Sequence, residues 1–260
     1  MRALEILKSV NLILAEDTRH SAHLLGHFGI HTPVSSFHEH NARKLTESMI
    51  GRLQDGKSLA LISDAGTPLI SDPGFTLVSA ALDKAFRVIP IPGPSALISA
   101  LSVSGIATDR FVFEGFLPAK RTPRIRRLQG LAQESRTQVF YEAPHRISRL
   151  LEDLILCYGP ERPATLAKEL TKIHETVYKD TLDNLYQWLQ EDDKRLKGEF
   201  VLVVEGLDAS MPENFEVERV LKILLRNLSV REAVAVGAEI LKMPRNKLYK
   251  LVVQKNNQSH

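Results

Sequence analysis

The alternation of short apolar runs with amphipathic stretches constrains the fold of this chain more than any other feature. The runs Leu12–Ala15, Leu59–Ser63 and Arg87–Ile91 predict buried strands, and the stretches Leu45–Leu53 and Phe75–Ala85 predict helices. Strands that alternate with helices form a parallel sheet with helices on both faces. Ligands of such sheets bind on the loops beyond the carboxyl ends of the strands.

The pattern becomes less regular after Asp109, which indicates a second domain with a mixed, partly antiparallel sheet. We therefore predict a two-domain α/β protein with domains at 1–109 and 110–207, followed by a helical tail at 208–260. The strands expected in the second domain are Phe111–Phe116, Thr137–Glu142, Ala164–Ala167, His174–Lys179 and Glu199–Glu205, and the expected helices are Leu128–Gln133, Ile147–Cys157 and Leu182–Gln190.

The tail begins after a break at Gly206–Glu213. Its periodicity predicts three helices, Val217–Leu228, Val230–Leu241 and Arg245–Val253. A turn around Met243-Pro244 gives the last two the form of a helix-turn-helix, in which the second helix is short and basic.

Composition narrows the class of protein. The single cysteine among 260 residues excludes a disulfide framework and a multi-thiolate metal site. His38 and His40 flank Glu39, but no second set of ligands has metal spacing, so no metal is expected. No apolar run reaches the roughly 18 residues of a membrane span. Without a signal peptide pattern, a cytoplasmic protein is the default expectation.

The loop Ser63–Gly74 is the densest candidate site, because it joins a predicted buried strand to a predicted helix. Its small residues let a ligand approach the backbone closely. Asp64 could accept hydrogen bonds from ribose hydroxyls or hold the loop. Asp72 precedes Pro73, which is typical of a helix N-cap with proline at the first helical position. The loop has neither the phosphate-loop nor the dinucleotide-binding glycine pattern.

A second loop, Pro90–Ala96, also joins a strand to a helix. Prolines on both sides of Gly93 stiffen it, and Ser95 could either cap the helix or contact a ligand. Two such loops at neighbouring strand ends predict a concave floor for a nucleoside-sized ligand.

Three polar clusters lie at other strand ends. The cluster Ala15–His20 is either a helix cap with an ion pair or a group that faces the substrate. The clusters Phe140–Arg146 and Lys168–Lys172 are either ordinary surface loops or a polar rim, in which Tyr141 offers a stacking face.

Basic residues are concentrated in two segments that contain no acid, although the net charge is only +3. Such segments favour a polyanionic partner, contacted through its phosphates rather than through base edges. The cations concerned are Lys120, Arg121, Arg124, Arg126 and Arg127 in one segment, and Lys242, Arg245, Lys247, Lys250 and Lys255 in the other.

These motifs together resemble the tetrapyrrole methylase superfamily and, within it, the family of ribosomal RNA small subunit methyltransferase I. The matching segments follow one another in the family order and cover nearly the whole chain. They are Ala15–Ser21, Ser63–Pro68 with Asp72–Gly74, Pro92–Ala96, Glu114–Pro118, Phe140–Glu142 with His145-Arg146, Lys168–Thr171 and Lys197–Glu199.

The resemblance implies an enzyme that uses S-adenosylmethionine (AdoMet) to methylate the 2′-hydroxyl of a cytidine in the decoding centre of 16S ribosomal RNA, and that acts as a homodimer. It implies AdoMet contacts from Asp64, Ala65, Gly66, Pro92, Gly93, Ser95, Ala96 and Tyr141. We expect Glu16, Asp17, Arg19 and Lys168 on the substrate side, and the base that takes the hydroxyl proton could be Glu16, His20, Lys168 or Glu169.

Two other function classes stay open, a small-molecule methylase of the tetrapyrrole type and a non-catalytic RNA-binding protein. The chain lacks the strand and Pro-Ile-Gly-Asn type loop with which the family begins, and Met1–Glu5 matches family sequence that follows that loop. We therefore expect the natural reading frame to extend upstream of Met1.

Overall fold

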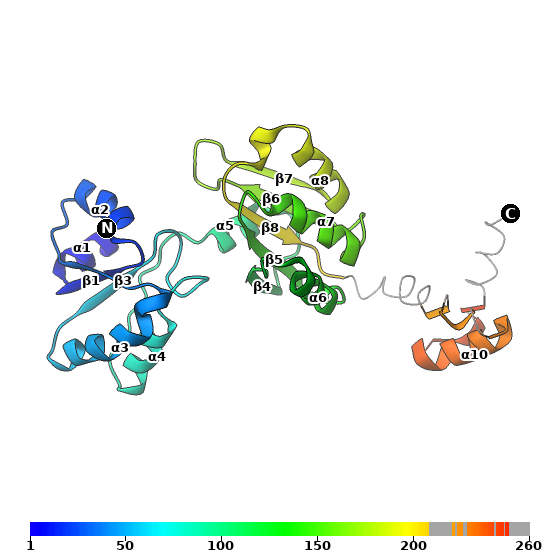
Figure 1. The fold of residues 1–260 in the computed structure, drawn as a ribbon, viewed down its shortest axis with the longest axis horizontal. Helices are drawn as coiled ribbons and strands as arrows, with labels where there is room; N and C mark the ends of the chain where they lie inside the picture. Colours follow the sequence, from blue (N-terminus) through cyan, green and yellow to red (C-terminus); the bar gives the residue numbers. More distant parts are fainter. Residues whose placement is uncertain (208–219, 222, 226–227, 242, 247, 250–260) are drawn as a thin grey trace. The chain divides into compact units, whose positions relative to one another are not determined.

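The computed structural model describes residues 1–207, 220–221, 223–225, 228–241, 243–246 and 248–249 (Figure 1). The chain divides into two compact units. The first contains Met1–Gly130 and Thr137–Glu205, and the second contains Leu131–Arg136 with the residues from Gly206 onward.

The first sheet of the larger unit is parallel, as the sequence predicts, but only two of its three strands were expected, because the strand Val34–Ser36 was not predicted. The three strands are β1 (Leu12–Ala15), β2 (Val34–Ser36) and β3 (Leu59–Ile62), in the order β2-β1-β3. The helices of this part of the chain are α1 (Arg2–Ser9), α2 (Thr18–His27), α3 (Glu39–Gln54), α4 (Phe75–Asp83) and α5 (Ala96–Val103).

Alternate residues of β1 pack against different helices, because successive side chains of a strand point to opposite faces of a sheet. Leu12 and Leu14 belong to a core with residues of α3 and α4. Ile13 packs in a second core that includes Leu4 and Leu7 of α1. The helices therefore cover both faces of the sheet, and both leucines of α1 are partly buried.

The prediction of a strand at Arg87–Ile91 was wrong. The segment is neither helix nor strand and belongs to neither sheet of the described residues, and the Val88 and Ile89 side chains are 41% and 43% exposed. An apolar run becomes a strand only when a neighbouring strand satisfies its backbone groups. In the described sheet, β3 pairs with β1 alone.

The second sheet is mixed, which confirms the prediction. Its order is β4-β5-β8-β6-β7, with β4 parallel to β5 and the other three pairs antiparallel. The strands are β4 (Phe111–Phe116), β5 (Thr137–Glu142), β6 (Pro163–Lys168), β7 (Thr176–Thr181) and β8 (Phe200–Val204), and the helices are α6 (Arg121–Leu131), α7 (Ile147–Tyr158), α8 (Leu182–Gln190) and the 3-10 helix η1 (Asp193–Leu196).

Helix α6 begins at Arg121 rather than at the predicted Leu128. Its buried stripe runs from Arg124 to Leu128, four residues apart, so an arginine occupies a core position. A search for apolar periodicity overlooks such a turn, because the buried side chain is charged.

The smaller unit contains α10 (Val230–Leu241), which matches the predicted helix. Ser229 and Glu232 form a reciprocal cap at its start: the Glu232 carboxylate accepts from Ser229 N at 3.0 Å, and Ser229 Oγ accepts from Glu232 N at 3.4 Å. Much of the predicted helices Val217–Leu228 and Arg245–Val253 lies outside the described residues. None of the described helices is long and apolar enough to cross a membrane.

Candidate active site

The loops that follow β1 and β3 and the loop that precedes α5 meet at the carboxyl edge of the first sheet. Asp64 Oδ1 accepts a hydrogen bond from Asp17 N at 3.2 Å. Thr67 Oγ1 donates to the Pro94 carbonyl at 3.0 Å. These bonds join segments far apart in the sequence, as expected for loops at the ends of parallel strands.

The loop from Gly66 to Gly74 has an unusual backbone. Leu69 and Ser71 have φ values of 73° and 65°, a region that costs about 1 to 3 kcal/mol for residues other than glycine. Gly74, with φ 135°, is the N-cap of α4. The interpretation of Asp72 as the N-cap was therefore wrong, because the helix starts two residues later than a cap at Asp72 requires.

Gly115 allows this loop to approach β4. It has φ 61°, and a Cβ added there would lie 3.0 Å from Ser71 Oγ. The register of β4 against β5 shifts between Phe113 and Gly115, which is a β-bulge. Such bulges redirect neighbouring side chains next to functional sites, and here the next residue is Phe116, a wall residue of the pocket.

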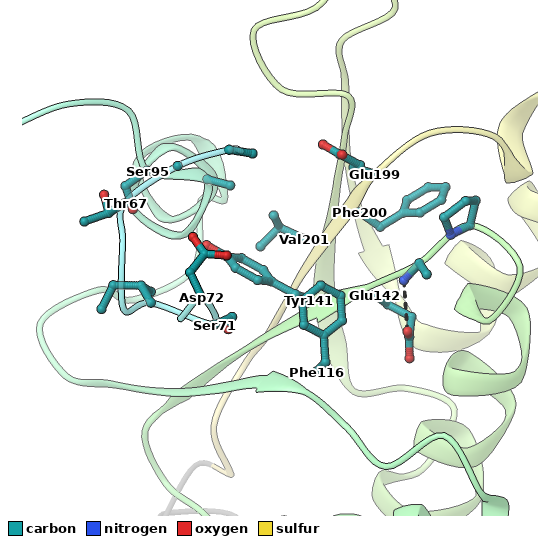
Figure 2. A pocket seen from close by; sticks show the side chains of 16 residues that line it. Thr67, Ser71, Asp72, Ser95, Phe116, Tyr141, Glu142, Glu199, Phe200 and Val201 are labelled. Atoms are coloured by element: carbon teal, nitrogen blue, oxygen red, sulfur yellow. Dashed lines mark hydrogen bonds between the residues drawn. The ribbon is translucent and has the colours of Figure 1, made fainter. Parts of the chain in front are cut away.

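A cavity of about 380 Å³ opens between these loops and the second sheet (Figure 2). Its volume lies within the usual range for small-molecule sites. The lining residues are Ala65, Gly66, Thr67, Ile70, Ser71, Asp72, Ser95, Ala96, Phe116, Tyr141, Glu142, Ala143, Pro144, Glu199, Phe200 and Val201.

Tyr141 fixes the start of α5 in the cavity wall. Its hydroxyl accepts a hydrogen bond from Leu97 N at 2.9 Å, and its ring packs edge to face against Phe113 and Phe116. Burial raises the pKa of this hydroxyl. Ser95 Oγ accepts from Ile98 N at 3.5 Å, so Ser95 caps the helix while it also lines the cavity.

Some of the residues predicted to contact AdoMet lie together in this cavity. Ala65, Gly66, Ser95, Ala96 and Tyr141 line the cavity. Asp64, Pro92 and Gly93 are not among the lining residues, and the Asp64 carboxylate instead holds the backbone of the loop after β1.

The predicted substrate-side residues lie outside the cavity lining. Asp17 caps α2, accepting from Arg19 N at 2.8 Å, and pairs with the Arg19 guanidinium at 3.0 Å. Hydrogen bonds from Arg19 lower the pKa of Asp17 to about 2. This is the arrangement of cap and ion pair that the sequence left open. Lys168 is 8% exposed, and its ammonium donates to the Lys194 carbonyl at 2.8 Å.

Asp72 is the lining residue that sequence reasoning assigned to another role. Figure 2 shows it extending from its loop toward Tyr141. Burial raises the pKa of its carboxyl to about 6, and the negative charges of Glu16 and Asp64 add to the effect. No sequence signal separated this aspartate from a helix cap. The charges that distinguish it come from Glu16 in the loop after β1 and from Asp64, eight residues earlier in its own loop.

The basic segment on α6 divides into buried and exposed cations. Arg124 was expected to contact RNA phosphate, but its guanidinium is 3% exposed and pairs with Asp153 at 2.7 Å. That expectation was wrong, because a buried paired arginine cannot reach a phosphate. Arg121 and Arg127 are more exposed but pair with Asp153 and Glu114. Lys120 and Arg126 are exposed.

Of the basic residues expected to bind RNA in the tail, Arg245 lies 3.9 Å from Glu239, and its side chain is 66% exposed. Lys247 and Lys250 lie outside the described residues.

The fold and cavity define a class of methylase. Residues 1–186 match the family model of tetrapyrrole (corrin/porphyrin) methylases, and residues 212–255 match that of the RsmI C-terminal HTH domain. Among solved structures, diphthine synthase matches 79% of this chain and 83% of its own, with a TM-score of 0.58 and 17% identity. Uroporphyrin-III C-methyl transferase from Thermus thermophilus, complexed with S-adenyl homocysteine, matches with a TM-score of 0.52 and 15% sequence identity. The match covers 78% of this chain and 89% of that one.

Two curated relatives are each called ribosomal RNA small subunit methyltransferase I. The protein from Pseudomonas aeruginosa is 49% identical over 99% of this chain and 93% of its own length. The protein from Xylella fastidiosa strain Temecula1 is 52% identical over 95% of this chain and 91% of its own length. This chain belongs to the ribosomal RNA small subunit methyltransferase I family, within the tetrapyrrole methylases.

Proposed function

We propose that this chain transfers a methyl group from AdoMet to the 2′-hydroxyl of a cytidine in the decoding centre of 16S ribosomal RNA. The observation that carries the proposal is identity of about half over nearly the full length of named ribosomal RNA methyltransferases. The test is transfer of a tritiated methyl group from AdoMet to 30S subunits that lack the modification. Labelling of a porphyrinoid but not of the subunits, or of neither, would contradict it.

The cavity suits AdoMet. Ala65, Gly66 and Ala96 have small side chains or none, so they leave space in the cavity for a ligand. Nothing lies within 4 Å of the position that a Cβ of Gly66 would take. Phe116 and Tyr141 supply aromatic surface for a nucleoside. AdoMet carries a methyl group already activated on a sulfonium, so the task of the protein is to position the acceptor and remove its proton.

Gly66→Ala is expected to weaken AdoMet binding about tenfold, because the added methyl occupies space at the cavity wall. Gly56→Ala is the matched control. The φ values of the two glycines are 71° and 76°, and neither has an atom within 4 Å of an added Cβ, but Gly56 lies in the turn before β3. Calorimetry should show weaker AdoMet binding only for Gly66→Ala. Both variants should lose a similar amount of thermal stability, because both glycines have positive φ values. Equal affinities would remove Gly66 from the AdoMet site.

The exposed cations of α6 support an RNA surface beside the cavity. The chain leaves β4 at Phe116, which lines the cavity and is 54% exposed, and reaches Lys120 and the start of α6 within a few residues. Exposed lysines and arginines contact phosphates, and exposed aromatic rings stack on unpaired bases. The target nucleotide would therefore enter past Phe116 while α6 holds the flanking backbone.

The double variant Lys120→Ala, Arg126→Ala is expected to flatten the salt dependence of binding to 30S subunits. The log-log slope should fall by up to about one for each lost phosphate contact. The matched control is Lys57→Ala, Lys84→Ala, which removes two exposed cations from turns of the first domain. AdoMet affinity should stay unchanged in both. A parental slope in the α6 variant would mean that this helix does not contact the RNA.

We further propose that the protein is a cytoplasmic homodimer, as the family resemblance implies. Ile98 and Val103 of α5 are 55% and 50% exposed and could contribute to a subunit contact. Light scattering at micromolar concentration should give twice the mass of the chain, and a monomer mass would refute the dimer.

A further inference from the structure

Three acidic side chains belong to residues that line the cavity, and their surroundings differ. The Glu142 side chain is fully buried, accepts from Ala143 N and lies 3.1 Å from Arg146. Glu199 is 74% exposed and pairs with Lys172 at 3.0 Å. Asp72 alone of the three has no cationic partner in the described part of the chain.

Charged and polar groups from the loops after β1 and β3 and from β5 act on Asp72. Glu16 follows β1 and Asp64 follows β3, and both act on Asp72 through their negative charge. The Ser63 hydroxyl, which donates to the Ala65 carbonyl at 3.1 Å, lowers the pKa of Asp72 and so acts against these charges in part. The Tyr141 hydroxyl of β5 is coupled to it electrostatically. Burial and like charges both disfavour the ionised carboxylate, so the carboxyl binds a proton more readily than an exposed aspartate does.

We propose that Asp72 is the general base that accepts the proton of the ribose 2′-hydroxyl, an inference that rests on the proposed function. The hydroxyl O–H bond breaks and its proton moves to an Asp72 carboxylate oxygen. The freed electron pair of the ribose oxygen forms the new bond to the methyl carbon. The bond between that carbon and the sulfonium sulfur breaks, and its electrons stay on sulfur.

The surroundings of Asp72 suit this role. A general base works best when its pKa lies near the working pH, since it is then ionised yet still holds a proton well. Asp72, with a pKa of about 6, meets this condition. Asp17, which Arg19 holds at a pKa of about 2, does not. The earlier candidate Lys168 is engaged with the Lys194 carbonyl.

The test compares Asp72→Asn with Glu16→Gln in single-turnover methyl transfer to 30S subunits at saturating AdoMet, as a function of pH. The wild-type rate should rise through pH 6 as Asp72 ionises. Asp72→Asn should lower the rate about 10² to 10⁴-fold and abolish this rise. Glu16→Gln should move the rise to lower pH, because it removes a negative charge that raises the pKa of Asp72.

Two measurements do not depend on activity. Carbon-13 NMR of labelled aspartate carboxyls in the ligand-free protein should show one carboxyl, absent from Asp72→Asn, that titrates near pH 6. Calorimetry should show that Asp72→Asn binds AdoMet with parental affinity. The assignment would be overturned if the Asp72 carboxyl titrated below about pH 5. It would also be overturned if Asp72→Asn kept a rate within about threefold of wild type, or lost AdoMet affinity about tenfold. Wild-type protein that does not methylate 30S subunits would refute the proposed function, and the inference with it.

Discussion

Asp153→Ala is expected to lower the free energy of unfolding by about 3 to 5 kcal/mol, the usual result of removing one partner of a buried ion pair. Asp153 is fully buried in α7, and its two carboxylate oxygens bind Arg121 and Arg124 of α6 at 2.9 and 2.8 Å. Without the carboxylate, the Arg124 guanidinium stays buried and keeps the Ala119 carbonyl, at 3.3 Å, as a hydrogen-bond acceptor. A buried charge without a counter-charge is what makes the loss large.

Urea denaturation checks this prediction. Arg126→Ala is the matched control on the same helix, since Arg126 is exposed, and it should change stability by less than about 0.5 kcal/mol. Replacing Arg124 and Asp153 together by leucine should recover much of the loss, because no buried charge is then left alone. If Asp153→Ala is as stable as Arg126→Ala, the pair between α6 and α7 is not part of the folded protein in solution.

Gly206→Ala is expected to destabilise the smaller unit by about 3 kcal/mol, at the upper end of the usual cost of overpacking. A Cβ at Gly206 would overlap the backbone of Ser135 and Arg136, which cannot rotate away as a side chain does. The neighbouring Leu207 N donates to the Glu134 carbonyl at 2.7 Å, so the added methyl would also separate these two segments.

Gly51→Ala provides the control for this substitution. Gly51 lies within α3, and nothing lies within 4 Å of the position of its Cβ. Alanine favours helix over glycine by up to about 1 kcal/mol, so this variant should be as stable as the parent or more stable. Thermal unfolding should separate the two variants by several degrees. Equal midpoints would show that Gly206 is not closely packed on Ser135.

The sequence determined most elements of the fold, because their signals are local. Leu12–Ala15 is apolar throughout and becomes β1, between α3 and α4 on one face and α1 and α2 on the other. The strands Phe111–Phe116 and Thr137–Glu142 have the predicted bounds. The family also followed from the sequence, since its motifs are runs of neighbouring residues in a fixed order.

Two errors at the level of elements share one physical cause. Arg87–Ile91 has the apolar composition of a strand, but strand formation depends on a partner that composition does not specify. The first turns of α6 were overlooked because Arg124 fills a core position through its bond with Asp153, which lies 29 residues away. In both cases the deciding contact is remote in sequence.

The cavity residues also divide into those that the local sequence identified and those that only the tertiary structure identified. The sequence identified the loops with Gly66 and Ser95, because small residues after a strand are visible locally. It could not separate Asp17 from Asp72, since both are aspartates near the start of a helix. The sequence offered the pairing of Asp17 with its neighbour Arg19 as one of two alternatives, and the structure selects it. Only the tertiary structure shows Asp72 half-buried against the charges of Glu16 and Asp64. The pKa of Asp17 is set by a chain neighbour, but that of Asp72 depends on burial and on the charge of Glu16, 56 residues away, which the residues beside Asp72 do not encode.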